Sequence, residues 1–318
     1  MTTPLHTFEV SKARHAQALS SLVREELGVT WGAAKKLCQR GKVRVNGETI
    51  TDPGHRVAAG SEVRVTPDAP VVTRGDSPVL HLTRDRLLHV DAHLVVVDKP
   101  PGISTVPFDE TERDTLVDRL GVALHRWDLA PPRAPLFVVH RLDKETSGAL
   151  VFGRSWVAKR HLADLFRRHE VDRVYLALAH GYIEREATIE SMLLEDRGDG
   201  LRGSARGRAG AQGRKAVTHI KPVAQLPGEG GATLLEVRLE TGRQHQIRIH
   251  LSERGHPIVG ERVYIRGYEA PPIAAPRVML HARTLGFTHP AHPEAAAVRF
   301  ESPLPEDFLE TARRLGLR

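Results

Sequence analysis

Short apolar runs separated by polar turns dominate the second half of the chain, and they predict a sheet. Runs of Val, Ile, Leu and Ala that turn residues interrupt are typical of buried strands. Such runs lie at 94–97, 137–139, 149–152, 174–179 and 233–239. Apolar residues at helical spacing at 111–127 and after Ser155 predict flanking helices. This half of the chain is therefore expected to be one large α+β domain.

The inner faces of those two helices can be named from their spacing. The first is expected to point Leu116, Leu120 and Leu124 inward. In the second, Ser155 is placed to cap the helix. Its inward-facing residues are expected to be Val157, Leu162, Leu165 and Phe166.

Residues 16–66 show another pattern, in which two short helices precede a hairpin. Gly28 is placed to end the first helix, and Thr30 to cap the second. Val43-Arg44-Val45 alternates as a strand into Asn46-Gly47, a strong hairpin signal. A Pro- and Gly-containing stretch follows and indicates a linker. We expect a small domain at 1–70, a linker at 71–79 and the large domain at 80–318.

Composition narrows the class of protein. Of 318 residues, 40% are hydrophobic and 27% charged, which is typical of a globular protein in solution. Cys38 is the only cysteine, so an intramolecular disulfide and a cysteine-rich zinc site are excluded. No apolar stretch approaches the roughly 18 residues of a membrane span, and the N-terminus lacks the features of a signal peptide. We expect a cytoplasmic protein.

The charge balance indicates a polyanionic partner. The net charge is +7 and the pI is about 9.8, which suits phosphate binding, although an arginine-rich proteome also makes basic proteins without such a partner. Between Trp31 and Gly47 there are five cations and no acid: Lys35, Lys36, Arg40, Lys42 and Arg44. They predict a phosphate-binding surface around the second helix and the next strand. The alternative is a solvated basic face.

The densest polar cluster lies between the apolar runs 137–139 and 149–152. His140, Arg141 and Asp143 would project there from two rigid strands, which is how catalytic groups are commonly aimed. An ordinary solvated loop is the alternative.

These residues resemble a known family. His140-Arg141-Leu142-Asp143, followed two residues later by Thr146-Ser147-Gly148, resembles the signature loop of the RluA-type pseudouridine synthases, which isomerise uridine in structured RNA. Three further segments resemble family motifs in the same order: the strand ending at Lys99 to Gly102, Arg173 to Ala177, and Thr241 to His250. The stretch 41–47 resembles the end of an S4-type RNA-binding domain.

The resemblance implies a mixed, largely antiparallel sheet with an RNA cleft and no cofactor. It implies Asp143 as the catalytic carboxylate, Arg248 as the cation beside it and Tyr175 as the ring that stacks on uracil. Arg141 would enter the RNA where the uridine leaves, and His140, Thr146 and Ser147 would orient the loop. The expected RNA-binding residues are His140, Arg141, Arg243 and the five cations of the small domain.

Three segments carry structural expectations of their own. Lys99 either faces RNA or is an exposed strand end. Residues 197–215 are rich in glycine and basic residues and predict a mobile, positively charged loop, which either orders on RNA or is a surface insertion. In 246–251, Ile247, Ile249 and Leu251 are expected on one face and Gln246, Arg248 and His250 on the other.

A metal site is not expected. His245 and His250 are five residues apart and would need a third ligand. The expected partner is RNA, bound by a monomer, with large-subunit (23S-type) ribosomal RNA ranked before transfer RNA. Two other classes stay open: a non-catalytic RNA-binding or ribosome-assembly factor, and a metal-dependent hydrolase that uses Asp143 with His140, His245 or His250.

Overall fold

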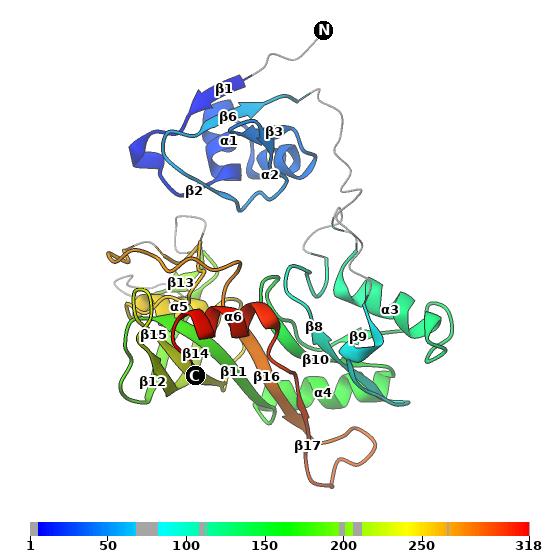
Figure 1. Ribbon diagram of the computed structural model, residues 1–318. Coiled ribbons are helices and arrows are strands. Elements are labelled where there is room, and N and C mark those ends of the chain that lie inside the picture. Colours follow the sequence, from blue (N-terminus) through cyan, green and yellow to red (C-terminus); the bar gives the residue numbers. More distant parts are fainter. Residues whose placement is uncertain are drawn as a thin grey trace. The chain divides into compact units, whose positions relative to one another are not determined.

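The computed structural model describes residues 6–67, 82–107, 112, 114–196, 201–205, 212–265 and 267–317 (Figure 1). Contacts divide the chain into two compact units, Met1–Leu80 and His81–Arg318. The linker predicted at 71–79 lies outside the described residues. Across the described ranges, no helix combines the length and the apolar character that a membrane crossing requires.

The N-terminal unit is a small α+β domain. A four-stranded antiparallel sheet has the order β1-β6-β3-β4, and β2 pairs with β5. The elements are β1 (His6–Glu9), η1 (Lys12–Arg14), β2 (Gln17–Ala18), α1 (Leu19–Leu27), α2 (Trp31–Gln39), β3 (Val43–Val45), β4 (Glu48–Thr49), β5 (Arg56–Val57) and β6 (Glu62–Val65). Its core contains Leu19, Leu22 and Val23 of α1 packed with Val43 of β3 and Val63 of β6.

The local signals of this unit act as predicted. Gly28 adopts the left-handed conformation with φ 62° and ends α1. Thr30 Oγ1 accepts a hydrogen bond from the Ala33 N–H at 3.3 Å and caps α2. Asn46 and Gly47, with φ 49° and 83°, join β3 to β4, as a tight hairpin turn with two positive φ angles requires.

The C-terminal unit is built on an 11-stranded sheet. Its order is β13-β12-β14-β15-β11-β16-β10-β8-β7, with β17 beside β16 and β9 beside β10. Among the strand pairs that the structure describes in this sheet, β10–β16 is parallel and the others are antiparallel, so the predicted mixed, largely antiparallel sheet is confirmed. The strands are β7 (Leu87–Val90), β8 (Leu94–Lys99), β9 (Phe137–Val138), β10 (Ser147–Gly153), β11 (Asp172–His180), β12 (Ala187–Leu194), β13 (Gly203–Ser204), β14 (Arg214–Leu226), β15 (Ala232–Leu239), β16 (Leu280–Phe287) and β17 (Val298–Glu301).

Helices cover both faces of this sheet. Val95 and Val97 of β8 pack in the main core cluster with Leu116 and Leu120, whereas Leu94 and Val96 pack in a second cluster with α4. This division follows from the alternation of side chains along a strand. The helical elements are η2 (Arg84–Arg86), α3 (Leu116–Arg126), α4 (Trp156–Arg168), α5 (Gln246–Glu253) and α6 (Glu306–Arg314).

The predicted helix faces hold with one exception. Leu116, Leu120 and Leu124 of α3 are buried, and Ser155 caps α4 by accepting from the Ala158 N–H at 3.1 Å. Val157 was predicted to face inward, but it is 62% exposed, so that prediction is wrong. Trp156, which begins this helix, is likewise 67% exposed.

Two further expectations need correction. Residues 246–251 were assigned to alternating faces, but they form α5 and all six are buried. The loop predicted at 197–215 is shorter, because Gly203–Ser204 form β13 against β12 and Arg214 begins β14. Residues 197–200 and 206–211, where the rest of that prediction falls, lie outside the described residues.

Candidate active site

The loop that carries Asp143 runs from β9 to the start of β10. Its end lies against β16, where Gly148 pairs with Ala282. A Cβ atom on Gly148 would lie 2.2 Å from the Ala282 carbonyl oxygen, and the residue has φ 120°. A glycine is therefore required where the loop enters the sheet.

Lys99 anchors the loop from inside the protein. Its side chain has no exposed surface, and Nζ donates to the carbonyl oxygens of Pro100 at 3.0 Å, Lys144 at 3.0 Å and Thr146 at 2.8 Å. Burial lowers the pKa of Lys99 to about 7. Three carbonyl acceptors match the three donors of an ammonium group. Both interpretations from the sequence, contact with RNA and an exposed strand end, are wrong.

Two more side chains hold the loop backbone. Arg277 donates to the Glu145 carbonyl at 3.0 Å and to Ser147 Oγ at 3.2 Å. Thr105 Oγ1 donates to the carbonyl of Leu142 at 3.1 Å and accepts its N–H at 3.2 Å. Anchors from separate elements give the loop one conformation, which a catalytic group needs.

His140 is packed against the protein behind the loop. Its Nε2 accepts the Val151 N–H at 3.1 Å, and its ring stacks on Phe166 with centroids 4.5 Å apart. Burial and, secondarily, the charge of Arg173 lower the pKa of His140 to about 3. The neutral ring is placed to orient the loop, and its contact with RNA stays a prediction. The neighbouring Arg141 is exposed.

Asp143 faces a buried cation. Arg248 Nη1 lies 3.6 Å from Asp143 Oδ2, and His245 Nε2 lies 3.8 Å from Oδ1. The side chains of Arg248 and Asp143 are only 8% and 16% exposed. Opposite charges attract more strongly in such a setting than in water. The structure thus brings together two of the three predicted catalytic residues from distant segments.

Glu261 fixes the orientation of Arg248. Its carboxylate accepts Arg248 Nε at 2.7 Å and Nη2 at 2.8 Å. Burial alone would lower the pKa of Arg248, but the hydrogen bonds and charge of Glu261 outweigh it and raise that pKa. This two-point contact leaves Nη1 for Asp143. No role was predicted for Glu261 from the sequence; its place directly after Gly260 was the available signal.

The third predicted catalytic residue, Tyr175, lies on β11. It pairs with Ala282 of β16, the same residue that pairs with Gly148 at the end of the loop. The residue is 8% exposed. Burial raises the pKa of Tyr175; Arg173 partly opposes this and Asp143 adds to it. The phenol is therefore neutral at neutral pH. Another tyrosine was missed: Tyr264 places its hydroxyl 2.7 Å from His245 Nδ1.

The predicted RNA-binding residues differ in exposure. Three of the five cations of the N-terminal unit are exposed, namely Lys36, Arg40 and Arg44, and Lys35 is half-buried. Lys42 is only 9% exposed, so the prediction that it lies on an open surface is wrong. Arg243 is half-buried and donates to the Lys215 carbonyl at 3.1 Å.

His250 is not available as a metal ligand in this arrangement. Its Nε2 lies 2.8 Å from Ser191 Oγ, and its Nδ1 lies 2.9 Å from Thr218 Oγ1. Both ring nitrogens are therefore engaged. His245 is engaged at Nδ1 by Tyr264, as described above.

Comparisons with known proteins identify the family. The family model for RNA pseudouridylate synthase matches residues 93–253, which include Asp143, Tyr175 and Arg248. The chain belongs to this family. A second model, for the S4 domain, matches residues 21–63 of the N-terminal unit.

Individual proteins that are similar to this chain support the same family. The ribosomal large subunit pseudouridine synthase D of Pseudomonas aeruginosa is 36% identical over 236 residues, which cover 70% of this chain and 69% of the relative. Its namesake from Xylella fastidiosa is 34% identical, with 85% of this chain and 80% of the relative covered. The structure of human RNA pseudouridylate synthase domain containing 4 superimposes with a TM-score of 0.57 at 25% identity, covering 73% of this chain and 93% of that one. The chain is accordingly an RNA uridine isomerase with an S4 domain.

Proposed function

We propose that this enzyme converts specific uridines of large-subunit ribosomal RNA to pseudouridine, with Asp143 as the catalytic carboxylate. Two observations support the substrate: the relatives named above are ribosomal large subunit enzymes, and an S4 domain precedes the catalytic unit. Transfer RNA is the second candidate. The chain is proposed to act as a monomer, and a ribosomal substrate supports a cytoplasmic location.

The reaction breaks the bond between uracil N1 and the sugar C1′, turns the base, and joins C5 to the same carbon. N1 gains one proton and C5 loses one, so the oxidation state does not change. We infer that neither a cofactor nor a metal takes part. Asp143 either attacks C1′ as a nucleophile or removes a sugar proton to begin an elimination. Both routes require an ionised carboxylate.

The observation that carries the assignment is the guanidinium of Arg248 beside Asp143. Burial disfavours the charged form of a carboxylate, and a nearby cation favours it. Here that cation is the guanidinium of Arg248, 3.6 Å from Asp143. Glu261 keeps that cation in place through two hydrogen bonds. Arg248 therefore acts as the counter-charge for Asp143 while the substrate excludes water.

Tyr175 and Arg141 would stabilise the RNA with its uridine extruded. An enzyme cannot reach the reacting atoms of a stacked base and has to extrude the nucleotide. The neutral ring of Tyr175 would stack on the extruded uracil, and its hydroxyl would assist loss of the C5 proton. Arg141, exposed beside Asp143 in the chain, would fill the vacated place in the RNA. His140 would orient the loop behind both.

Chemical mapping of pseudouridine in total RNA, with and without the gene, tests the proposed substrate. We expect at least one site in large-subunit ribosomal RNA to lose its signal in the deletion strain. The wild-type gene should restore the site, and a gene encoding Asp143→Asn should not. A loss confined to transfer RNA would replace the target. A map unchanged by the deletion would refute the proposed activity on both RNA classes.

A further inference from the structure

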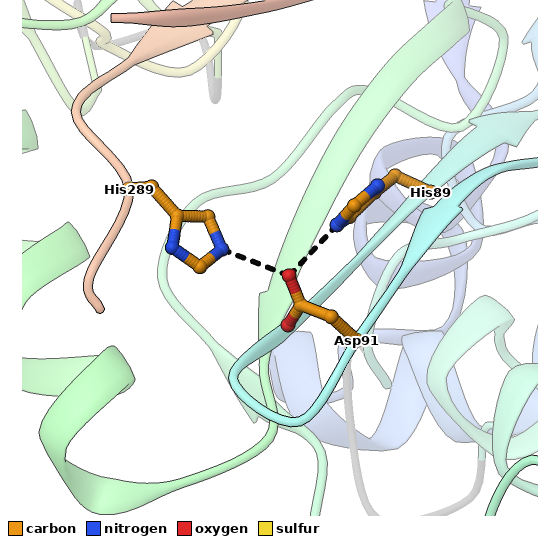
Figure 2. A group of neighbouring side chains, drawn as sticks. All are labelled: His89, Asp91 and His289. Carbon is orange, nitrogen blue, oxygen red and sulfur yellow. Dashed lines mark hydrogen bonds and ion pairs between the residues drawn. The ribbon is translucent and has the colours of Figure 1, made fainter. Parts of the chain in front are cut away.

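At the opposite end of β8 from the anchoring Lys99, two histidines converge on one carboxylate. His89 comes from β7, Asp91 from the turn before β8, and His289 from the segment after β16 (Figure 2). His89 Nε2 and His289 Nε2 each lie 2.8 Å from the same oxygen, Asp91 Oδ2. The six residues of β8 separate this cluster from the catalytic loop by about 17 Å at the usual rise of a strand.

Backbone hydrogen bonds fix the orientation of the Asp91 carboxylate. Asp91 Oδ1 accepts the N–H groups of His93 at 2.6 Å and Leu94 at 2.9 Å, so Oδ2 is left for the histidines. The backbone thus holds one oxygen of the carboxylate and presents the other to both imidazole rings.

More imidazoles surround this cluster. The ring of His93 lies 5.9 Å from that of His289, and His292 stacks on His289 with centroids also 5.9 Å apart. The Nδ1 atom of His93 is buried and has no hydrogen-bond partner among the residues that the structure describes. An ion has access, because the side chains of His89 and Asp91 are 36% and 29% exposed.

We propose that His89, Asp91 and His289 bind one divalent transition-metal ion, for which Zn²⁺ is the best match. In the described part of the chain, this is the group whose His and carboxylate ligand atoms all lie within 4.8 Å of one another. Two imidazole nitrogens and one carboxylate oxygen are ligands that Zn²⁺ favours. Water, or His93 after rotation of its ring, would supply the fourth ligand.

The geometry needs a small adjustment to accept the ion. Tetrahedral ligands about 2.0 Å from Zn²⁺ lie about 3.3 Å from one another, so each 2.8 Å contact would open by about 0.5 Å. Binding at His289 Nε2 moves the proton of that ring to Nδ1, which now accepts the Ala291 N–H at 3.2 Å. That hydrogen bond is lost on binding. The ion would join the β7–β8 hairpin to the segment after β16, a structural role separate from the uridine chemistry.

Metal titration of the full chain tests this proposal. The protein is stripped with a chelator, dialysed, and titrated with Zn²⁺ in a calorimeter and with Co²⁺ by visible absorption. We expect one saturable site per chain, intense absorption bands of four-coordinate Co²⁺, and a rise in Tm of about 5–10 °C when Zn²⁺ is 100-fold above its Kd. The absence of a saturable site, or of those bands in the wild-type protein, would overturn the proposal.

A double variant separates metal binding from simple hydrogen bonding. His89→Gln with His289→Gln keeps an N–H donor for Asp91 at both positions, so the fold is retained, but it removes both nitrogen ligands. We expect binding at least about 100-fold weaker and no rise in Tm. The control is His219→Gln, which alters a histidine whose side chain is 40% exposed and lies 2.8 Å from Glu240, and this variant should bind as wild type does. Wild-type affinity in the double variant, or equal loss in the control, would show that the three residues form only a hydrogen-bonded tie.

Discussion

The two units of the chain differ in where their charged residues lie. The described N-terminal unit has an apolar core, and most cations of α2 and β3 lie on its surface. Among the described residues of the C-terminal unit, six charged residues are 8% exposed or less: Asp98, Lys99, Arg173, Arg248, Glu261 and Arg277. A buried charge costs several kcal/mol unless partners compensate it, and all six have hydrogen-bond partners. Exposed cations suit a polyanion, whereas buried ones hold a loop and its carboxylate in place.

The largest effect short of removing Asp143 is expected from Arg248→Met. This change removes the counter-charge and leaves Glu261 buried without its partner, so we expect kcat to fall by about 10³-fold or more, with a much smaller change in RNA affinity. Single-turnover kinetics and a filter-binding assay separate the two. Arg238→Met, which removes an exposed arginine paired with Asp172, is the matched control and should behave as wild type. Loss of RNA affinity alone would contradict the role given to Arg248.

Glu261→Gln tests whether orientation of Arg248 matters. The amide keeps one acceptor but loses the two-point contact with the guanidinium, so kcat is expected to fall by about 10- to 100-fold while KM stays nearly constant. Breaking the buried pair should also lower the free energy of unfolding by about 3 kcal/mol. Glu261→Asp, which keeps the charge, should recover part of the activity. Equal activity of all three proteins would show that Arg248 needs no positioning.

On the N-terminal unit, the exposed cations should affect binding and leave the chemistry unchanged. Replacing Lys36, Arg40 and Arg44 together with Gln is expected to weaken RNA binding on the order of 10-fold and to reduce the slope of log affinity against log salt by about 2–3. The single-turnover rate at saturating enzyme should not change. Arg64→Gln, on an exposed arginine paired with Glu62, gives a single-charge comparison. An unchanged salt slope in the triple variant would remove this surface from the RNA interface.

The pH dependence of stability also distinguishes the two units. Burial is the main cause that lowers the pKa of His281 from its ordinary value of 6.5 to about 4. Between these values the unfolded chain binds a proton that the folded protein does not, so stability falls as the pH drops from 6.5 towards 4, by about 3 kcal/mol in total. No described histidine of the N-terminal unit is buried. Hydrogen exchange at pH 7 and pH 5 should therefore show the larger loss of protection in the C-terminal unit, and His281→Gln should reduce it.

The same contrast explains what could be predicted from the sequence. A helix with one buried face and one face in water has apolar residues at regular spacing in its sequence. This spacing predicted α3, where Leu116, Leu120 and Leu124 are buried as expected. Local chemistry is equally visible, as in the Thr30 cap and the Asn46-Gly47 turn. The polar loop around Asp143 was found because two apolar runs bracket it.

Predictions failed where a segment is buried on all sides or where its partners are remote in the chain. All six residues of 246–251 are buried, so the period that distinguishes a helix from a strand is missing. Lys99 was expected at the surface because lysine is rarely buried, and two of its three carbonyl partners lie 45 and 47 residues away. The contact between Glu261 and Arg248 likewise spans 13 residues across a loop. Such contacts depend on the tertiary fold and leave no local pattern.

The central claim is that the ionised carboxylate of Asp143 performs the chemistry. It is tested most directly by single-turnover formation of pseudouridine with Asp143→Asn on the RNA identified by mapping, because this variant keeps the size of the side chain and removes only its charge. We predict a rate at least about 10⁴-fold below wild type, with the affinity for the same RNA retained within a few-fold. Pseudouridine formation at a rate near that of the wild-type enzyme would contradict the assignment of Asp143.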